Sequence, residues 1–99
     1  MGVMDSKVAL VTGAAAGIGK ATALAFAAEG ASVAVVDSEE QRGGLVADEI
    51  REAGGRALFI PADVSQTDLA NAMVGATMSR FGRLDFAFNN AGIEGDPGL

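Results

Sequence analysis

The sequence predicts an α/β protein built on a doubly wound parallel sheet with helices on both faces. Two observations predict it. Four short apolar runs alternate with three longer segments of helical character, which gives the order β-α-β-α-β-α-β within 99 residues. Each apolar run is also followed closely by glycine, aspartate or asparagine. Right-handed crossovers then favour the strand order 3-2-1-4, with a ligand-binding switch point between the first and fourth strands.

The first strand is expected over residues 7–11, a nearly continuous apolar run that is typical of a strand buried on both faces. The first helix is expected over residues 17–28. Because its polar residues are few, mainly Lys20 and Thr22, we expect it to be covered on most sides. Gly30 is well placed to end it.

The second strand is expected over residues 32–36 and ends at Asp37. A polar stretch then opens a second helix, which the glycines at 54–55 end. Gly43 and Gly44 lie inside this helix and should each weaken it by roughly 0.5–1 kcal/mol relative to alanine. The stripe of this helix that faces the sheet is expected to be Val46, Ile50 and Ala53.

The third strand is expected over residues 56–60 and is closed by Pro61. Ser65 followed by Asp68 resembles a capping box, which starts the third helix. Gly82 ends this helix. Its buried stripe is expected to be Leu69, Met73 and Ala76, extended by Phe81.

The fourth strand is expected over residues 84–88, and a loop over 93–99. Between them stands Asn89-Asn90-Ala91-Gly92. Asparagine side chains here can tie neighbouring strand ends together, since a buried amide without a partner costs roughly 1–3 kcal/mol. The Ala-Gly step lets the backbone pass close to a sugar. The simpler interpretation is a turn.

Composition excludes several classes of function. With 49% apolar and 20% charged residues, the chain is an ordinary globular domain, at most one at this length. A net charge of −6 disfavours nucleic acid and anionic membranes as partners. Without cysteine or histidine, the chain offers no disulfide, thiolate nucleophile or Cys/His zinc site. No apolar run approaches the ~20 residues of a membrane span, and we expect a cytoplasmic protein.

Residues 12–19, here called the glycine turn, read Thr-Gly-Ala-Ala-Ala-Gly-Ile-Gly between a strand and a helix. Glycine permits the tight turn and a close approach of the backbone to a ligand. The following helix directs its free N–H groups and partial positive charge at that ligand. The turn is therefore predicted to bind the pyrophosphate of a dinucleotide. A P-loop is excluded, because the positions that need glycine and Ser/Thr hold Ala14 and Ala21.

Asp37 stands 18 residues after Gly19, where a carboxylate can accept hydrogen bonds from an adenosine ribose. Capping of the second helix is an alternative role, compatible with the first. Like charges about 4 Å apart at an effective dielectric of ~20 repel by roughly 4 kcal/mol, so a 2′-phosphate is disfavoured here. No base directly follows Asp37, and Ala16 rather than a base precedes Gly17. NAD is therefore predicted over NADP.

Asp63 and Val64 follow the third strand. Adenine has an exocyclic amine that can donate to Asp63 and a flat apolar face for Val64. The alternative is a strand-end turn that caps the next helix.

Together these motifs resemble the short-chain dehydrogenase/reductase family, over nearly the whole chain. Residues 12–19 look like its Thr-Gly-x-x-x-Gly-x-Gly motif, Asp37 its NAD-selecting acid, Asp63-Val64 its adenine pair and 89–92 its Asn-Asn-Ala-Gly motif. The resemblance implies a Rossmann-like sheet, NAD, an alcohol or ketone substrate and a homo-oligomer. The cofactor-binding residues it implies are Gly13, Ala16, Gly17, Ile18, Gly19, Asp37, Asp63, Val64, Asn90, Ala91 and Gly92.

The same resemblance shows what these 99 residues lack. The family's chemistry uses Ser, Tyr-x-x-x-Lys and a further Asn, yet the chain has no tyrosine, and its lysines are Lys7 and Lys20. We therefore expect no catalytic residue, no metal site and no activity of the chain alone. Residues 1–99 are expected to be a partial dinucleotide-binding domain. A stand-alone binding or scaffold module is the alternative. The free apolar edge of the fourth strand should favour self-association.

Overall fold

The computed structural model describes residues 2–62 and 67–89. Its four strands are all parallel and lie in the order β3-β2-β1-β4, which confirms the predicted topology. Three helices connect the strands. The elements are β1 Val8–Thr12, α1 Gly17–Ala28, β2 Ser32–Asp37, α2 Glu40–Glu52, β3 Arg56–Pro61, α3 Thr67–Phe81 and β4 Phe86–Asn89.

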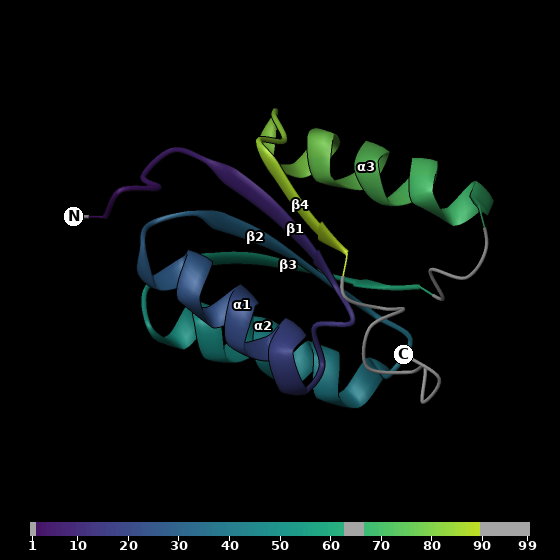
Figure 1. Cartoon of the computed structure of the whole chain (residues 1–99), viewed down its shortest axis with the longest axis horizontal. Coiled ribbons are helices and arrows are strands. Elements are labelled where there is room, and N and C mark those ends of the chain that lie inside the picture. The colour runs from purple at the N-terminus through teal and green to yellow at the C-terminus, as the bar shows by residue number, and fades with distance from the viewer. Residues whose placement is uncertain (1, 63–66, 90–99) are drawn as a thin grey trace.

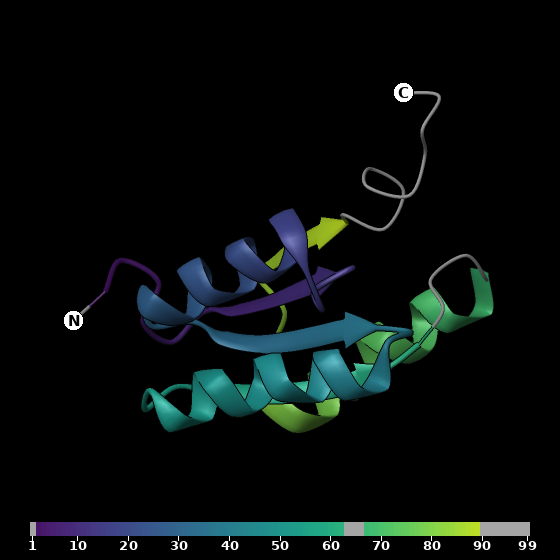
Figure 2. The ribbon, with the colours of Figure 1, turned by 90° about the horizontal axis from the view of Figure 1, so that it is seen from below.

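The helices lie on both faces of the sheet, with α1 and α2 on one face and α3 on the other (Figures 1 and 2). Val11, Val33 and Val35 point toward α1 and α2 and form the larger core with Ile50. Their sequence neighbours point the other way, and Leu10, Ala34 and Val36 pack with Met73 of α3. This alternation explains the apolar runs, because β1 and most of β2 are buried on both faces.

The glycines predicted to end the helices do so. Gly30, Gly54 and Gly82 follow α1, α2 and α3 with φ of 101°, 95° and 82°. A left-handed backbone of this kind suits a residue without Cβ and stops the helix.

The expectation that α1 is covered on most sides is wrong for this chain. Gly19 and Ala23 are its buried residues, whereas Ile18 is 54% exposed and Ala21, Ala25 and Ala28 are exposed. The helix is apolar all round, but among the described residues it packs mainly on the sheet and α2, with Met4 near its carboxyl end.

In α2 the predicted stripe is correct at Val46 and Ile50 and wrong at Ala53. Ala53 is the C-cap and is exposed, because the helix ends there. Ala47 and Gly43 are buried instead. Gly43 lies against Phe59 of β3, where a Cβ would overlap the aromatic ring.

In α3 Met73 is buried as predicted, but the stripe continues through Thr77 and not through Ala76, which is half-buried. The Thr77 hydroxyl donates to the Met73 carbonyl at 2.8 Å, which satisfies this buried polar group. Phe81 is half-buried. Ser65 and the side chains of Asp68 and Leu69 lie outside the described part of the chain.

β4 begins at Phe86, two residues later than predicted, because Asp85 pairs with β1 through its side chain. The Asp85 N–H donates to the Val8 carbonyl at 2.9 Å, and the Val8 N–H donates to the Asp85 carboxylate at 2.8 Å. Arg83 binds the same carboxylate at 2.7 Å. Hydrogen bonds from Arg83 and then from Val8 lower the pKa of Asp85, and the same contact raises the pKa of Arg83.

Candidate functional site

The predicted site residues that the structure describes meet at the carboxyl edge of the sheet, the edge at which the strands end. The glycine turn leaves β1 there, Asp37 ends β2 and Asn89 ends β4 (Figure 1). In a parallel sheet with this strand order, the switch point lies between β1 and β4, and ligands bind outside the carboxyl ends of these two strands. Asp63, Val64, Asn90, Ala91 and Gly92 lie outside the described residues, so their predicted roles stay predictions.

The glycine turn uses two glycines in left-handed backbone. Gly13 has φ of 61° and Gly17 has φ of 59°, values that L side chains rarely adopt. Between them, the Ala14 N–H donates to the Val36 carbonyl at 3.1 Å. The turn is therefore fixed to the end of β2 before α1 begins.

The amino end of α1 carries no acidic or capping side chain from its own first turn. No side chain caps the helix at Ala16, and its first turn contains no acidic residue. The Lys20 N–H already donates to the Ala16 carbonyl at 3.2 Å, within the helix. The partial positive charge of this helix end, roughly half an elementary charge, thus faces the carboxyl edge uncompensated by an acid of α1.

Asp37 joins the glycine turn to the segment before α2. One carboxylate oxygen accepts the Ala15 N–H at 3.0 Å, and the other accepts the Glu39 N–H at 2.8 Å. The Asp37 carbonyl also accepts the Ala62 N–H at 3.1 Å, beyond β3. The capping interpretation is wrong, because Glu39 is the N-cap residue of α2 and no side chain caps this helix. The Asp37 side chain instead accepts the N–H of Glu39 itself.

The Asp37 carboxylate has capacity for a ligand. A carboxylate offers about four acceptor positions, and the two described hydrogen bonds use two of them. Asp37 is half-buried and therefore reachable at the sheet edge. Together with the amino end of α1, these features fit a ligand that carries both hydroxyl groups and phosphates.

Asn89 ties the end of β4 to the end of β1. The Thr12 hydroxyl lies 2.9 Å from the Asn89 side-chain oxygen and 3.5 Å from the Phe88 carbonyl, and Thr12 and Asn89 are Cα partners. This is the strand-tying role predicted for the Asn-Asn-Ala-Gly motif. The contact of Thr12 with Asn89 was not predicted. The polar residue at the end of an otherwise apolar strand could have indicated it.

Other kinds of site find no support in the described part of the chain. It contains no group of three or more acidic side chains arranged to hold a metal ion. Within the same residues, no helix combines the length and apolarity that crossing a bilayer requires.

The sequence matches the family model for short chain dehydrogenase over residues 7–98. A 3beta-hydroxysteroid dehydrogenase of Mediterraneibacter gnavus is 46% identical over 95 residues, which cover 96% of this chain and 34% of that protein. A cyclohexanol dehydrogenase of Rhodococcus sp. is 49% identical, with 90% of this chain and 37% of that protein covered.

Solved structures agree with these matches. A short chain dehydrogenase from Mycobacterium avium superimposes with a TM-score of 0.86 at 42% identity, covering 91% of this chain and 34% of that one. A 7 alpha-hydroxysteroid dehydrogenase complexed with NADH and 7-oxo glycochenodeoxycholic acid gives 0.83 at 38% identity, covering 85% and 33%. The chain spans about a third of the length of the relatives it matches. By its sequence, its strand order and its glycine turn, the chain belongs to the short-chain dehydrogenase family.

Proposed function

We propose that the chain is the NAD-binding, amino-terminal part of a short-chain dehydrogenase/reductase that transfers hydride between NAD(H) and an alcohol or carbonyl compound. One observation carries this proposal: Asp37 is hydrogen-bonded to the glycine turn beside the amino end of α1, whose first turn contains no acidic residue. A structural neighbour complexed with NADH supports a nicotinamide dinucleotide as the ligand.

The turn would hold the pyrophosphate of the dinucleotide, and Asp37 would accept hydrogen bonds from the adenosine ribose. Asp63 and Val64 would take the adenine, and the segment Asn90-Ala91-Gly92 would lie close to a sugar of the dinucleotide. The backbone positions assigned to the cofactor are Gly13, Ala16, Gly17, Ile18, Gly19, Ala91 and Gly92.

In this proposal NAD binds more tightly than NADP, because the Asp37 carboxylate would lie next to the adenosine ribose. A 2′-phosphate would lie close to Asp37, and a difference of only about 1.4 kcal/mol is tenfold in affinity. No arginine or lysine stands at position 16 or 38 to offset the repulsion, since these positions hold Ala16 and Ser38.

When bound, the nicotinamide ring accepts or supplies the hydride. The residues of this chain bind and orient the dinucleotide, and none of them is assigned to proton transfer. Without tyrosine among the 99 residues, the chain alone would bind the cofactor without turnover. That property also fits the second candidate, a binding module without catalysis.

Isothermal titration of the folded chain with NAD and with NADP tests the proposal. We expect saturable binding of NAD and at least tenfold weaker binding of NADP. Circular dichroism establishes that the sample is folded. No binding of either nucleotide by a folded sample, or equal binding of both, contradicts the proposal.

A further inference from the structure

We propose that the amino edge of the sheet, where the strands begin, carries a second site that binds the phosphate group of inorganic phosphate or of a small phosphomonoester. The site is formed by Ser32, Arg56 and Arg80, on the α3 face. β2 runs from Ser32 at this edge to Asp37 at the other, so about 16 Å of strand at ~3.3 Å per residue separates it from the proposed dinucleotide site. The two sites are therefore independent.

Ser32 provides a buried hydroxyl without a hydrogen-bond partner among the described residues. The residue is only 8% exposed. Its backbone N–H donates to the Lys7 carbonyl at 2.9 Å, so the hydroxyl alone is unsatisfied. Buried hydroxyls in native proteins are nearly always paired, and a bound ion or water is one of the partners that satisfies such a group.

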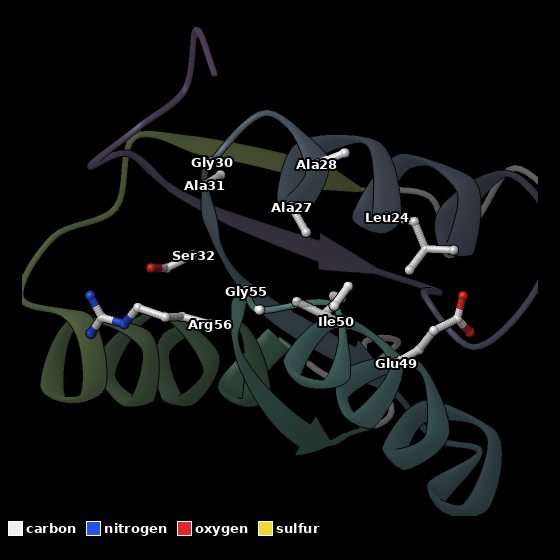
Figure 3. A pocket seen from close by; sticks show the side chains of 12 residues that line it. Leu24, Ala27, Ala28, Gly30, Ala31, Ser32, Glu49, Ile50, Gly55 and Arg56 are labelled. Atoms are coloured by element: carbon white, nitrogen blue, oxygen red, sulfur yellow. The ribbon is translucent and has the colours of Figure 1, made fainter. Parts of the chain in front are cut away.

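Arg56 stands beside Ser32 on the neighbouring strand. The two residues are Cα partners in the parallel register of β2 and β3, so their side chains project from the same face of the sheet. It is the α3 face, because Ala34 and Val36, two and four residues after Ser32, pack there with Met73. Figure 3 shows both side chains directed to one side, away from the middle of the apolar groove between α1 and α2.

Arg80, in the last turn of α3, places a second guanidinium at the Phe81 ring that Arg56 also contacts. The guanidinium carbons of Arg56 and Arg80 each lie 5.3 Å from the centre of the Phe81 ring. The ring thus positions two cations through cation–π contacts. Two positive charges near one ring repel each other, and an anion that contacts both guanidinium groups would offset that repulsion.

Neither arginine forms an ion pair with an acid of the residues that the structure describes. The ion pairs of the described residues join Lys20 to Glu49, Arg51 to Asp48 and Arg83 to Asp85, and leave Arg56 and Arg80 out. Lys7 and Arg42 also stand outside these ion pairs, but among the described residues only Arg56 and Arg80 contact one common aromatic ring. Asp85, which lies next to Val8 and so near Ser32, has its charge offset by Arg83.

This set of groups suits a phosphate group more than a carboxylate. Guanidinium forks bind phosphate oxygens with paired N–H donors, and two of them match a dianion. The Ser32 hydroxyl adds a donor to a further oxygen and thereby gains the partner it lacks. The lone carboxylate of a small acid carries half this charge and has fewer oxygens to share.

The test is an NMR titration of the labelled chain with inorganic phosphate at constant ionic strength, followed through the arginine Nε–Hε signals. We expect the Arg56 and Arg80 signals to shift together and saturate. Loss of a hydrogen bond to a charged group weakens binding by about tenfold or more, so Arg56→Gln and Arg80→Gln should each do so, and Ser32→Ala by about three- to tenfold. Arg42→Gln, an exposed arginine of α2 outside the ion pairs of the described residues, is the charge-matched control and should bind like wild type.

Shifts confined to residues 13–19 would assign phosphate to the glycine turn and overturn the proposal, whether or not NAD binds there. Equal shifts in all variants, or shifts that never saturate, would overturn it as well. Titration with glycerol 3-phosphate shows which form of phosphate the site binds. If this ester binds at least as tightly as inorganic phosphate, the ligand is a phosphomonoester. If it binds more weakly, the ligand is free phosphate. Acetate bound as tightly as either would overturn the assignment to phosphate.

Ser32→Ala also has a readout without ligand. Because it removes an unpaired buried hydroxyl, the variant should melt no lower than wild type in phosphate-free buffer and should lose most of the stabilisation by phosphate. A lower melting temperature without phosphate would show that the hydroxyl has an internal partner, and would overturn the proposal.

Discussion

The Asp37 carboxylate accepts the Ala15 N–H at 3.0 Å and so links the end of β2 to the glycine turn before any ligand is bound. Its other oxygen holds the Glu39 N–H at 2.8 Å. The residue proposed to select the cofactor therefore also shapes the loops around it. Replacing Asp37 changes two properties at once, binding preference and local structure.

For Asp37→Arg we expect the affinity ratio to move toward NADP, with a loss of about 1–3 kcal/mol in the free energy of unfolding because both hydrogen bonds disappear. Urea denaturation and nucleotide titration measure the two effects. Glu52→Arg, the same charge change at an exposed site in α2, is the control and should alter neither. An unchanged ratio would remove Asp37 from the ribose site.

The two glycines of α2 should respond oppositely to alanine. At Gly44 a Cβ meets nothing within 4 Å, so Gly44→Ala should stabilise the chain by about 0.5–1 kcal/mol. At Gly43 the new methyl overlaps the Phe59 ring, and we expect a net loss of about 1–3 kcal/mol. Chemical denaturation of both variants measures this. Equal stabilisation by both would mean that Phe59 moves aside freely.

Thr12→Val should loosen the junction of β1 and β4. The variant keeps the β-branched shape but loses the hydroxyl that lies 2.9 Å from the Asn89 side chain, at a cost of about 1–2 kcal/mol in unfolding free energy. Thr22→Val removes a hydroxyl that binds only the carbonyl one helical turn before it, and should stay within about 0.5 kcal/mol of wild type. If both variants lose the same unfolding free energy, the contact of Thr12 with Asn89 does not stabilise the chain.

The stability of the folded chain should depend on pH through the carboxylate of Asp85. Arg83 and the Val8 N–H lower the pKa of Asp85 in the folded chain, so its contribution is complete above the unfolded pKa of about 3.9 and is lost as the pH falls through the lower folded value. Melting temperatures of wild type and Asp85→Asn should thus differ near neutral pH and converge below about pH 4. A gap that persists in acid would contradict this assignment.

The outer edge of β4 remains a predicted site of self-association. Phe86 is 40% exposed, and Ala87 is exposed on the strand at the end of the sheet. Sedimentation velocity should show association that Ala87→Lys suppresses, because a charged edge resists strand pairing. Ala25→Lys on the exposed side of α1 is the matched control. A wild-type monomer at high concentration would refute the prediction.

The alternation of apolar runs with helical segments was enough to predict the strand order, because right-handed crossovers favour the order 3-2-1-4. Helical periodicity located Val46, Ile50 and Met73 in the core correctly. It failed at Ala53, since a residue at the correct angular position is buried only if the helix continues past it.

Contacts between distant elements were beyond the reach of local patterns. The burial of Gly43 depends on Phe59, a residue of another element. The later start of β4 depends on Asp85 reaching Val8 across 77 positions. At the candidate site, the glycine turn and Asp37 were found through their positions at strand ends, whereas the hydrogen bond between Asp37 and Ala15 needed the fold.

β4 is held to β1 at both of its ends, by Asp85 on Val8 and by Asn89 on Thr12, and each contact joins residues 77 positions apart. Such long-range contacts must overcome loop-closure entropy before they contribute, so they tend to form late. We therefore expect the strand to join the sheet last and to open first, with its amide hydrogens exchanging sooner than those of β2. The order in which the chain folds would then make the β1–β4 junction, the switch point of the sheet, the last feature to be completed.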